Sequence, residues 1–365
     1  MSESTTISER KAKHLEICLN PSLYKVEGPI PESGAASPGS GSGNGTAGLH
    51  LGSGAGFEAF HFSHRSMPEL DASKVDTSIQ FLGRTMALPF FISCMTGGSE
   101  GGFRVNRELA NAAGILGIPV GTGSVRVLLD HPELDSHFAL KSQAPSVPLL
   151  ANIGAVQVRD LDPSRLDDIM RRLDADALVI HLNPGQELFQ PDGDRDFRGV
   201  RDGIARFIAR APYPVIVKET GFGIAPDESS FLLDAGAAYV DIAGAGGTSW
   251  ISVEAYRDNE AALAVAREFD NWGHPTAQLL AASPVASGKI LASGGIRSGM
   301  DVAKALALGA ASCGLALPLA RVAHSGGSEA VVAYLRYIET VLRGVMVLTG
   351  SSNIAGLRRS GVLLR

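Results

Sequence analysis

Residues 177–187, Ala177-Leu178-Val179-Ile180-His181-Leu182-Asn183-Pro184-Gly185-Gln186-Glu187, join an apolar run directly to a polar cluster. Such a run is typical of a buried parallel strand that emerges at the mouth of a barrel. The two-residue period of a strand puts His181 and Asn183 on the same face as Ala177 and Val179. An imidazole, two amides and a carboxylate then crowd one rim, where they could bind an anion and a divalent cation. The alternative is an ordinary polar loop that caps the next helix.

Seven further apolar runs alternate with helical segments. These candidate strands span 88–94, 118–122, 147–153, 214–219, 238–243, 289–293 and 312–316. The helices predicted between them include 104–116, 163–173, 197–210, 227–235 and 299–308. Eight such units in about 250 to 280 residues match the size of a TIM (β/α)8 barrel. We expect a long amphipathic helix at 328–349 to close the barrel and a short polar tail at 350–365.

Two segments precede the barrel. Residues 8–19, SERKAKHLEICL, predict a short basic helix, and the usual meaning of such a charge run is a solvated face. Residues 28–56 are dominated by glycine and serine, so little of this segment can be buried and we expect it to be flexible. The sequence therefore predicts an N-terminal arm (1–27), a Gly/Ser-rich insertion (28–56) and one barrel domain (57–365).

The composition limits the class of partner and compartment. A hydrophobic fraction of 45%, a charged fraction of 19% and a net charge of −6 give no broad basic surface, so nucleic acid is not an expected partner. Cys18, Cys94 and Cys313 are odd in number and lack CxxC spacing, which favours a reducing compartment. There is no apolar run long enough for a secretion signal or a bilayer span. We expect a cytoplasmic protein without a membrane partner.

The ends of the predicted strands carry the candidate chemistry. Each is followed by polar or glycine-rich residues, as in an enzyme barrel, whose active site lies at the carboxyl ends of the strands. These residues are Met95 to Gly98, Gly123 to Arg126, Asn152, His181 to Glu187, Lys218-Glu219, Gly244 to Thr248, Gly294 to Arg297 and Ala316-Leu317.

Residues 292–299, ASGGIRSG, predict a phosphate site between the seventh strand and a helix. Glycine frees backbone amides there, and barrels commonly bind phosphate after strands seven and eight. The alternative is a tight turn that needs glycine only for its dihedral angles. Arg297 and the Gly246-Gly247-Thr248 stretch favour phosphate, and Lys218 on strand five makes the site suitable for flavin mononucleotide (FMN). No glycine motif of a Rossmann domain is present at the required spacing.

Several motifs in order resemble type 2 isopentenyl diphosphate isomerase. The resemblance covers residues 8–26 and 56–350. The motifs are Arg10-Lys11 with His14, Met95-Thr96-Gly97-Gly98, Gly123 to Arg126, Ala151 to Gly154, His181-Leu182-Asn183 with Gln186-Glu187, Lys218-Glu219 with Gly221 and Gly223, Gly246 to Trp250, Trp272 to Thr276 and Ser293 to Gly309.

The resemblance implies an FMN-dependent barrel that interconverts isopentenyl and dimethylallyl diphosphates. It also implies that the flavin must be reduced, usually by NADPH, that it acts as the acid/base, that Mg²⁺ is required, and that the protein is a homo-oligomer of four or eight chains. Two rivals remain open: another FMN-dependent TIM-barrel oxidoreductase of the hydroxyacid or dihydroorotate type, and a non-catalytic barrel that binds a phosphorylated ligand.

The resemblance also assigns roles to residues. His181, Gln186 and Glu187 would be catalytic, with Glu187 as the magnesium ligand. The expected substrate-binding residues are Arg10, Lys11, His14, Ser124, Val125, Arg126, Asn183 and Gln186. The expected cofactor-binding residues are Cys94, Met95, Thr96, Ser124, Asn152, Lys218, Thr248, Gly295, Ile296, Arg297, Ala316 and Leu317. Val125 stands where the family commonly has a polar residue, and the 28–56 insertion is longer than the family's loop.

Overall fold

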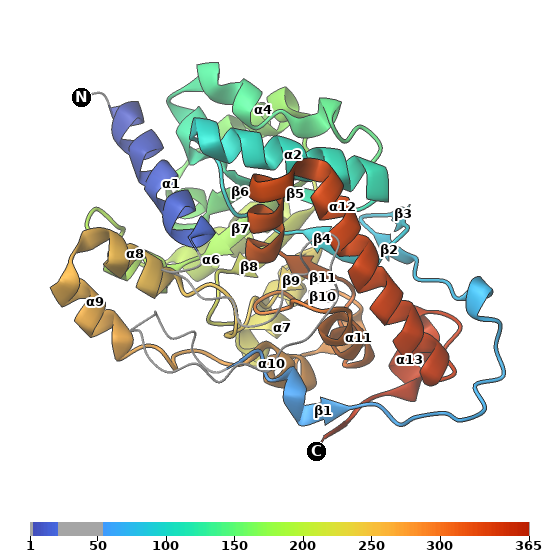
Figure 1. Cartoon of the computed structure of the whole chain (residues 1–365). Helices are drawn as coiled ribbons and strands as arrows, with labels where there is room; N and C mark the ends of the chain where they lie inside the picture. The colour runs from blue at the N-terminus through green and yellow to red at the C-terminus, as the bar shows by residue number, and fades with distance from the viewer. Residues whose placement is uncertain (1–2, 21–53, 365) are drawn as a thin grey trace.

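Eight parallel strands form the barrel of this computed structural model, which describes residues 3–20 and 54–364 (Figure 1). In chain order they are β4 (Phe90–Ile92), β5 (Val120–Ser124), β6 (Leu149–Gly154), β7 (Ala177–Leu182), β8 (Val215–Glu219), β9 (Tyr239–Asp241), β10 (Ile290–Leu291) and β11 (Cys313–Leu315). The hydrogen-bonded order is β10-β9-β8-β7-β6-β5-β4-β11. A parallel bridge between Ala292 and Cys313 joins the last two strands. All eight predicted strands and the predicted TIM barrel are confirmed.

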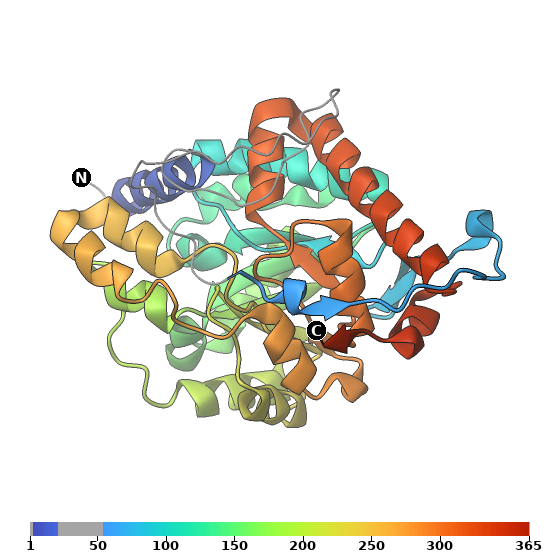
Figure 2. The same ribbon diagram turned by 60° about the horizontal axis from the view of Figure 1, so that its bottom comes forward.

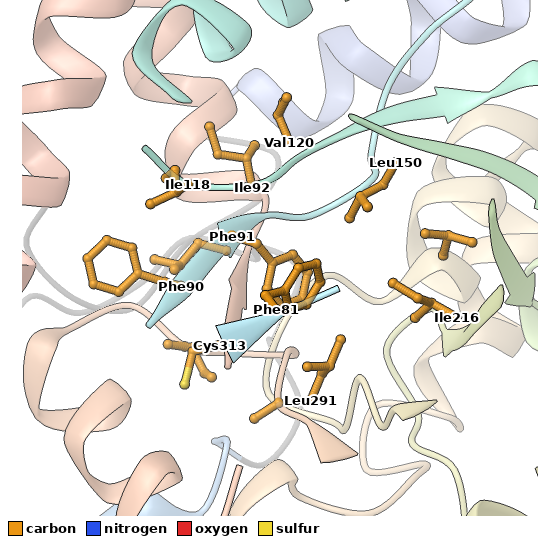
Figure 3. Packing of buried hydrophobic residues seen from close by; sticks show 14 of the residues in the cluster. Phe81, Phe90, Phe91, Ile92, Ile118, Val120, Leu150, Ile216, Leu291 and Cys313 are labelled. Carbon is orange, nitrogen blue, oxygen red and sulfur yellow. The ribbon is translucent and has the colours of Figure 1, made fainter. Parts of the chain in front are cut away.

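The barrel interior is filled by apolar side chains. Phe91, Leu150, Ile216 and Leu291 are at most 4% exposed and come from β4, β6, β8 and β10 (Figure 3). Strands that are buried on both sides need such continuous apolar runs, and this is why the runs could be found in the sequence.

A small hairpin packs against the amino-terminal part of the barrel. It consists of β2 (Ile79–Phe81) and β3 (Arg84–Met86), which pair antiparallel. The Phe81 ring stacks on Tyr239 at the start of β9, with centroids 4.9 Å apart, and on Phe91, at 6.1 Å. The carboxyl ends of the strands lie at the opposite end of the barrel, where the candidate site is found.

Helices follow the strands as expected for βα units. They are α2 (Glu100–Leu116), α3 (Ala155–Asp160), α4 (Pro163–Leu173), α5 (Pro184–Phe189), α6 (Val200–Arg210), α7 (Pro226–Asp234), α8 (Trp250–Asp258), α9 (Glu260–Arg267), α10 (Thr276–Ala282), α11 (Gly299–Ala307) and α12 (Leu317–Leu348). Local sequence sets their ends. The Ser99 hydroxyl caps α2 by accepting from the Gly102 amide, and Gly117 ends this helix in the left-handed region (φ 66°). The five predicted helices are confirmed.

The carboxyl-terminal region differs from the prediction in two ways. The helix predicted at 328–349 is the second part of α12, which starts at Leu317 and bends at Gly327, a residue with φ 65°. The polar tail predicted at 350–365 is wrong, because it contains α13 (Ile354–Ser360) and β12 (Leu363–Leu364). Ile354 and Leu357 are buried in the main core, and β12 pairs antiparallel with β1 (Phe60–His61). Tertiary contacts stabilise these short elements.

The N-terminal helix α1 (Glu3–Leu19) confirms the predicted basic helix and extends it. It lies against α2, α8 and α12, and Figures 1 and 2 both show it beside α8. The solvated-face interpretation is wrong, because His14, Leu15, Ile17 and Cys18 are buried. The Arg321 side chain on α12 fixes the end of the helix by donating from Nε to the Cys18 carbonyl oxygen at 2.9 Å.

Most of the predicted insertion at 28–56 lies outside the described residues. Its last residues, 54–56, pack on the barrel: Ala55 is 8% exposed, and its carbonyl accepts from the Ala277 amide at 2.9 Å. The expectation that little of this segment is buried therefore fails at its carboxyl-terminal end. Among the described helices, none is long and apolar enough to span a bilayer.

Candidate active site

A cavity opens at the carboxyl ends of the strands. Its wall contains most of the predicted cofactor residues, which are Cys94, Met95, Lys218, Thr248, Gly295, Ile296, Arg297, Ala316 and Leu317. The segments that follow β4, β9, β10 and β11 supply all of them except Lys218, which lies in β8.

Two glycine-rich loops meet along one wall of this cavity. A Cβ at Gly247 would lie 2.8 Å from the Gly295 amide nitrogen, and a Cβ at Gly295 would lie 2.6 Å from the Gly246 carbonyl oxygen. Only glycine permits this approach of two backbones, and Gly295 has a left-handed φ of 77°. Arg297 joins the same loops by donating from Nη2 to the Gly246 carbonyl at 2.9 Å. Backbone amides and one guanidinium on a glycine-rich turn suit a phosphate group.

Lys218 lies deep in the cavity. Its side chain is 9% exposed, and its Nζ donates to the Glu219 carbonyl oxygen at 2.7 Å. The carboxylate of Glu219 accepts from the amides of Gly221 and Phe222, which holds the loop after β8 in place. The glycine-rich wall suits the phosphate end of an FMN molecule. The buried Lys218 ammonium suits the other end, because it can donate a hydrogen bond to the flavin ring system.

A second group of polar side chains, which we call the polar cluster, lies where β7 runs into α5. The Asn183 amide donates to Glu187 Oε1 at 3.0 Å and to Gln186 Oε1 at 3.2 Å. Gln186 in turn donates from Nε2 to Glu254 Oε1 at 2.8 Å. Three residues of the predicted rim, Asn183, Gln186 and Glu187, are therefore brought together, and they are joined to α8 through Glu254.

Glu254 also connects the polar cluster to α1. Its side chain is fully buried, and Oε1 lies 2.9 Å from His14 Nε2, whereas Oε2 lies 3.3 Å from Nη2 of Arg257. Burial alone would raise the pKa of Glu254, but the hydrogen bonds from His14 and Gln186 and the charge of Arg257 hold it below its ordinary value. The His14 ring is also in edge contact with Trp250, at 5.5 Å between centroids.

Positive charge gathers at the same place. Burial and the charge of Arg10 lower the pKa of Lys11 to about 8, with Glu254 and Glu187 opposing the shift. Burial also lowers the pKa of Arg10, and its Nε is buried with no hydrogen-bond partner among the described residues. Arg126 lies 4.0 Å from Asp194 at the edge of the cluster. These cations supply locally the charge that an anionic ligand needs in an acidic protein.

His181 is held in one orientation as a neutral ring. Its Nδ1 lies 2.9 Å from Oδ1 of Asn152, so Asn152 orients His181. Burial and the charges of Lys218 and Lys11 lower the pKa of His181 to about 3. The ring therefore stays uncharged at neutral pH in the absence of an anion.

Glu187 is the carboxylate predicted to bind magnesium. Its Oε1 accepts from Asn183 and its Oε2 accepts from the Asp194 amide at 2.8 Å. In the part of the chain that the structure describes, no group of three or more His, Cys, Asp or Glu side chains could hold a metal. A magnesium ion here would therefore be held by one or two such side chains, with waters and the phosphates of a ligand completing its shell, which is the usual pattern for Mg²⁺.

The remaining predicted residues are placed differently. Thr96 lies in a smaller pocket with Lys11 and His14, and this pocket shares Trp250 with the main cavity. The Ser124 hydroxyl accepts from the Arg126 amide at 3.5 Å. Val125 is 1% exposed and belongs to the hydrophobic core, so the structure does not bring its side chain to the site.

Three residues at the site were not predicted from the sequence: Glu254, Arg257 and Cys18. Cys18 lines both the cavity and the smaller pocket. Glu254 and Arg257 follow the glycine-rich loop 244–248 at a helical spacing of three residues, which is a common surface ion pair. The signal that could have identified Glu254 and Arg257 as site residues is their position directly after a loop at the end of a strand. Only the fold shows that α1 covers them.

Comparison with known proteins agrees with this geometry. The FMN-dependent dehydrogenase family matches residues 189–364. An isopentenyl-diphosphate delta-isomerase of Borreliella afzelii is 37% identical over 360 residues, which cover 98% of this chain and 94% of that protein. The enzyme of the same name from a Synechococcus strain is 41% identical over 363 residues, with coverages of 98% and 97%.

Solved structures with similar folds are more distant in sequence. A mandelate oxidase mutant with an FMN adduct has a TM-score of 0.58 at 20% identity, with 86% of this chain and 90% of that chain covered. A soluble mutant of (S)-mandelate dehydrogenase from Pseudomonas putida has a TM-score of 0.60 at 17% identity, with coverages of 85% and 88%. These likenesses concern the fold alone. The relatives of high identity and near-complete coverage show that this chain belongs to the isopentenyl-diphosphate delta-isomerase family.

Proposed function

We propose that this protein interconverts isopentenyl diphosphate and dimethylallyl diphosphate, with FMN bound in the cavity. The observation that carries the proposal is the adjacency of two unlike sites. One is a glycine-walled cavity with a buried lysine, and the other is a polar cluster with several cations. Trp250 lies between them, since it lines the cavity and contacts His14. A flavin and a diphosphate can therefore be bound side by side.

The cavity residues fit FMN by their chemistry. The backbone at Gly247 and Gly295, with Arg297, would hold the phosphate, because these glycine-rich loops and the guanidinium line the cavity together. Lys218 would donate to the ring system. When bound and reduced, with NADPH as the proposed electron donor, the flavin would supply the acid/base group for the proton transfer.

The polar cluster would bind the diphosphate. Arg10, Lys11 and Arg126 would offset its charge, and His181 and Asn183 would add hydrogen bonds. Glu187 would hold Mg²⁺ against the phosphate oxygens, with waters completing the coordination shell. Helix α1 contributes two of the cations, so it completes the site from outside the barrel.

Gln186 would orient the hydrocarbon end of the substrate. Its amide is fixed on both sides, by Asn183 at Oε1 and by Glu254 at Nε2. His14 holds Glu254 from the other direction. This connected chain of polar groups keeps one amide orientation, and the buried α1 side chains Ile17 and Cys18 pack beside Trp250 and exclude water there.

The direct test is an anaerobic assay with FMN-loaded protein, reductant, Mg²⁺ and isopentenyl diphosphate. We expect dimethylallyl diphosphate to form, and to form only when the flavin is reduced. Absence of isomerisation at full flavin loading would contradict the proposal. Flavin reduction by a hydroxyacid or by dihydroorotate in a parallel assay would instead favour the oxidoreductase alternative.

We further propose a cytoplasmic homo-oligomer of four or eight chains. Exposed apolar side chains, among them Ile115, Trp272 and Tyr337, offer area for association. Light scattering of the purified protein gives the mass directly, and a monomer at micromolar concentration would contradict the proposal.

A further inference from the structure

Asp241 is a buried carboxyl group that the proposed roles above leave unused. It ends β9 and is 1% exposed. A buried carboxyl group is costly unless it is hydrogen bonded or paired with a cation, so its presence calls for a specific partner.

The strand register places a cationic residue on the neighbouring strand. In the parallel pairing of β8 with β9, Lys218 is the direct neighbour of Asp241. Adjacent strands lie about 4.8 Å apart, and register partners point to the same face of the sheet. Lys218 lines the cavity, so Asp241 lies on the barrel's inner side next to the ammonium-bearing chain.

A hydrogen bond connects Asp241 to the cavity from its other side. The Ser293 hydroxyl donates to Asp241 Oδ1 at 2.7 Å, and Ser293 itself lines the cavity before the phosphate-binding glycines. Burial raises the pKa of Asp241, while the charge of Lys218 and the Ser293 hydrogen bond lower it. Burial raises the pKa of the Cys94 thiol, also in the cavity wall, to about 12, with the charge of Lys218 opposing this shift and that of Asp241 adding to it.

We propose that Asp241 is a positioning residue that sets the charge beneath the bound flavin by offsetting the ammonium of Lys218. This inference rests on the proposed binding of FMN in the cavity. Lys218 alone would place one uncompensated positive charge in a low-dielectric wall, and such a charge stabilises the more negative, reduced form of a flavin. With Asp241 ionised beside it, the field at the ring is smaller and the reduced flavin keeps a higher proton affinity, as an acid/base role requires.

The test is the midpoint potential of bound FMN, measured without substrate in the Asp241→Asn variant. The amide keeps the size of the side chain and can still accept from Ser293, but it removes the charge. We expect the midpoint potential of bound FMN to rise by at least about 30 mV. For a two-electron couple, this shift means that the protein's preference for reduced over oxidised FMN increases about tenfold. An unchanged or lower potential would overturn the inference.

A control variant separates charge at the flavin from the loss of a buried carboxylate in general. Glu339 is 8% exposed and is paired with Arg336 and Arg343 on α12. Glu339→Gln should lower thermal stability and leave the flavin potential unchanged. An equal potential shift in this variant would overturn the inference.

A second variant covers the case in which Asp241→Asn does not fold. Ser293→Ala keeps the Asp241 carboxyl group but removes the hydrogen bond that it accepts. Loss of this hydrogen bond favours the protonated, uncharged form of Asp241. We expect a smaller rise in potential, and no rise would count against the inference. These potentials need no isomerase activity, so a failed isomerase assay alongside a shifted potential would overturn the proposed reaction and leave the role of Asp241 standing. Failure to bind FMN would overturn both.

Discussion

The cavity and the polar cluster lie at the same end of the barrel but are built in different ways. The cavity depends on backbone, because glycines at 246–247 and 294–295 let two loops touch in its wall. The polar cluster depends on side chains from α1, α5 and α8, which are held by Glu254. A backbone site tolerates little added volume, whereas a side-chain site is sensitive to charge. A substitution in one site should therefore weaken ligand binding at that site and leave binding at the other unchanged.

The largest effect is expected from Gly295→Ala. A Cβ there would lie 2.6 Å from the Gly246 carbonyl and 2.8 Å from the Ala55 Cβ, at a left-handed φ. We expect FMN affinity to fall about 100-fold, since roughly 1–2 kcal/mol of left-handed strain adds to the clash and displaces the loop. Fluorescence titration of the apoprotein measures this affinity.

Gly288→Ala is the matched control for that variant. Gly288 also has a left-handed φ, of 67°, but a Cβ there meets nothing within 4 Å. Equal loss of FMN in both variants would mean that strain alone, and not the close approach of the loops, explains the result.

Glu187→Gln should affect the other site. We expect magnesium-dependent binding of isopentenyl diphosphate to weaken by about 10- to 100-fold, because the amide cannot replace a carboxylate as a ligand of Mg²⁺. FMN affinity should be unchanged. The exposed Glu133→Gln variant, with a side chain 66% exposed, serves as the control. Loss of FMN from Glu187→Gln would show that the two sites are not separate.

Lys11 provides a test by pH. Because burial and Arg10 lower its pKa to about 8, the cationic form is lost as the pH rises through this value. We expect kcat/KM to fall by up to about fivefold between pH 8 and pH 9, since this parameter reports the free enzyme. Lys11→Arg should remove the decline, and Lys13→Arg, an exposed position on the same helix, should retain it. A decline that persists in Lys11→Arg must come from another group.

The smallest effect concerns stability and His181. The pKa of His181 is about 3 in the folded chain, below the ordinary value of about 6.5 in the unfolded chain. Between these values the unfolded chain binds more protons, so the contribution of the neutral ring is complete above pH 6.5 and is lost as the pH falls.

Urea unfolding of the apoprotein at pH 7 and pH 5.5 measures this contribution. His181→Gln should reduce the acid-induced loss of unfolding free energy by about 1 kcal/mol relative to the wild type. His64→Gln, at an exposed position, is the control. An identical pH dependence in wild type and His181→Gln would show that His181 is not held neutral.

The two sites also differ in how far the sequence predicts them. The apolar runs and the glycine pattern at 292–299 are local signals, and they were sufficient for the eight strands and for most of the cavity wall. Glu254 could not be predicted, because its role depends on α1 packing across α8 from more than 200 residues away in the chain. The burial of Val125 and Ala55 and the short elements α13 and β12 likewise depend on tertiary contacts that no local pattern reports.

The central claim is that the cavity binds FMN and the polar cluster binds the diphosphate. It is tested most directly by a crystal structure of the protein with FMN and isopentenyl diphosphate, prepared without oxygen. We predict the FMN phosphate between the loops at Gly247 and Gly295 with Lys218 at the ring, and the diphosphate between Arg10, Lys11 and Glu187. A diphosphate bound in the glycine-walled cavity, or an FMN phosphate in the polar cluster, would contradict the account.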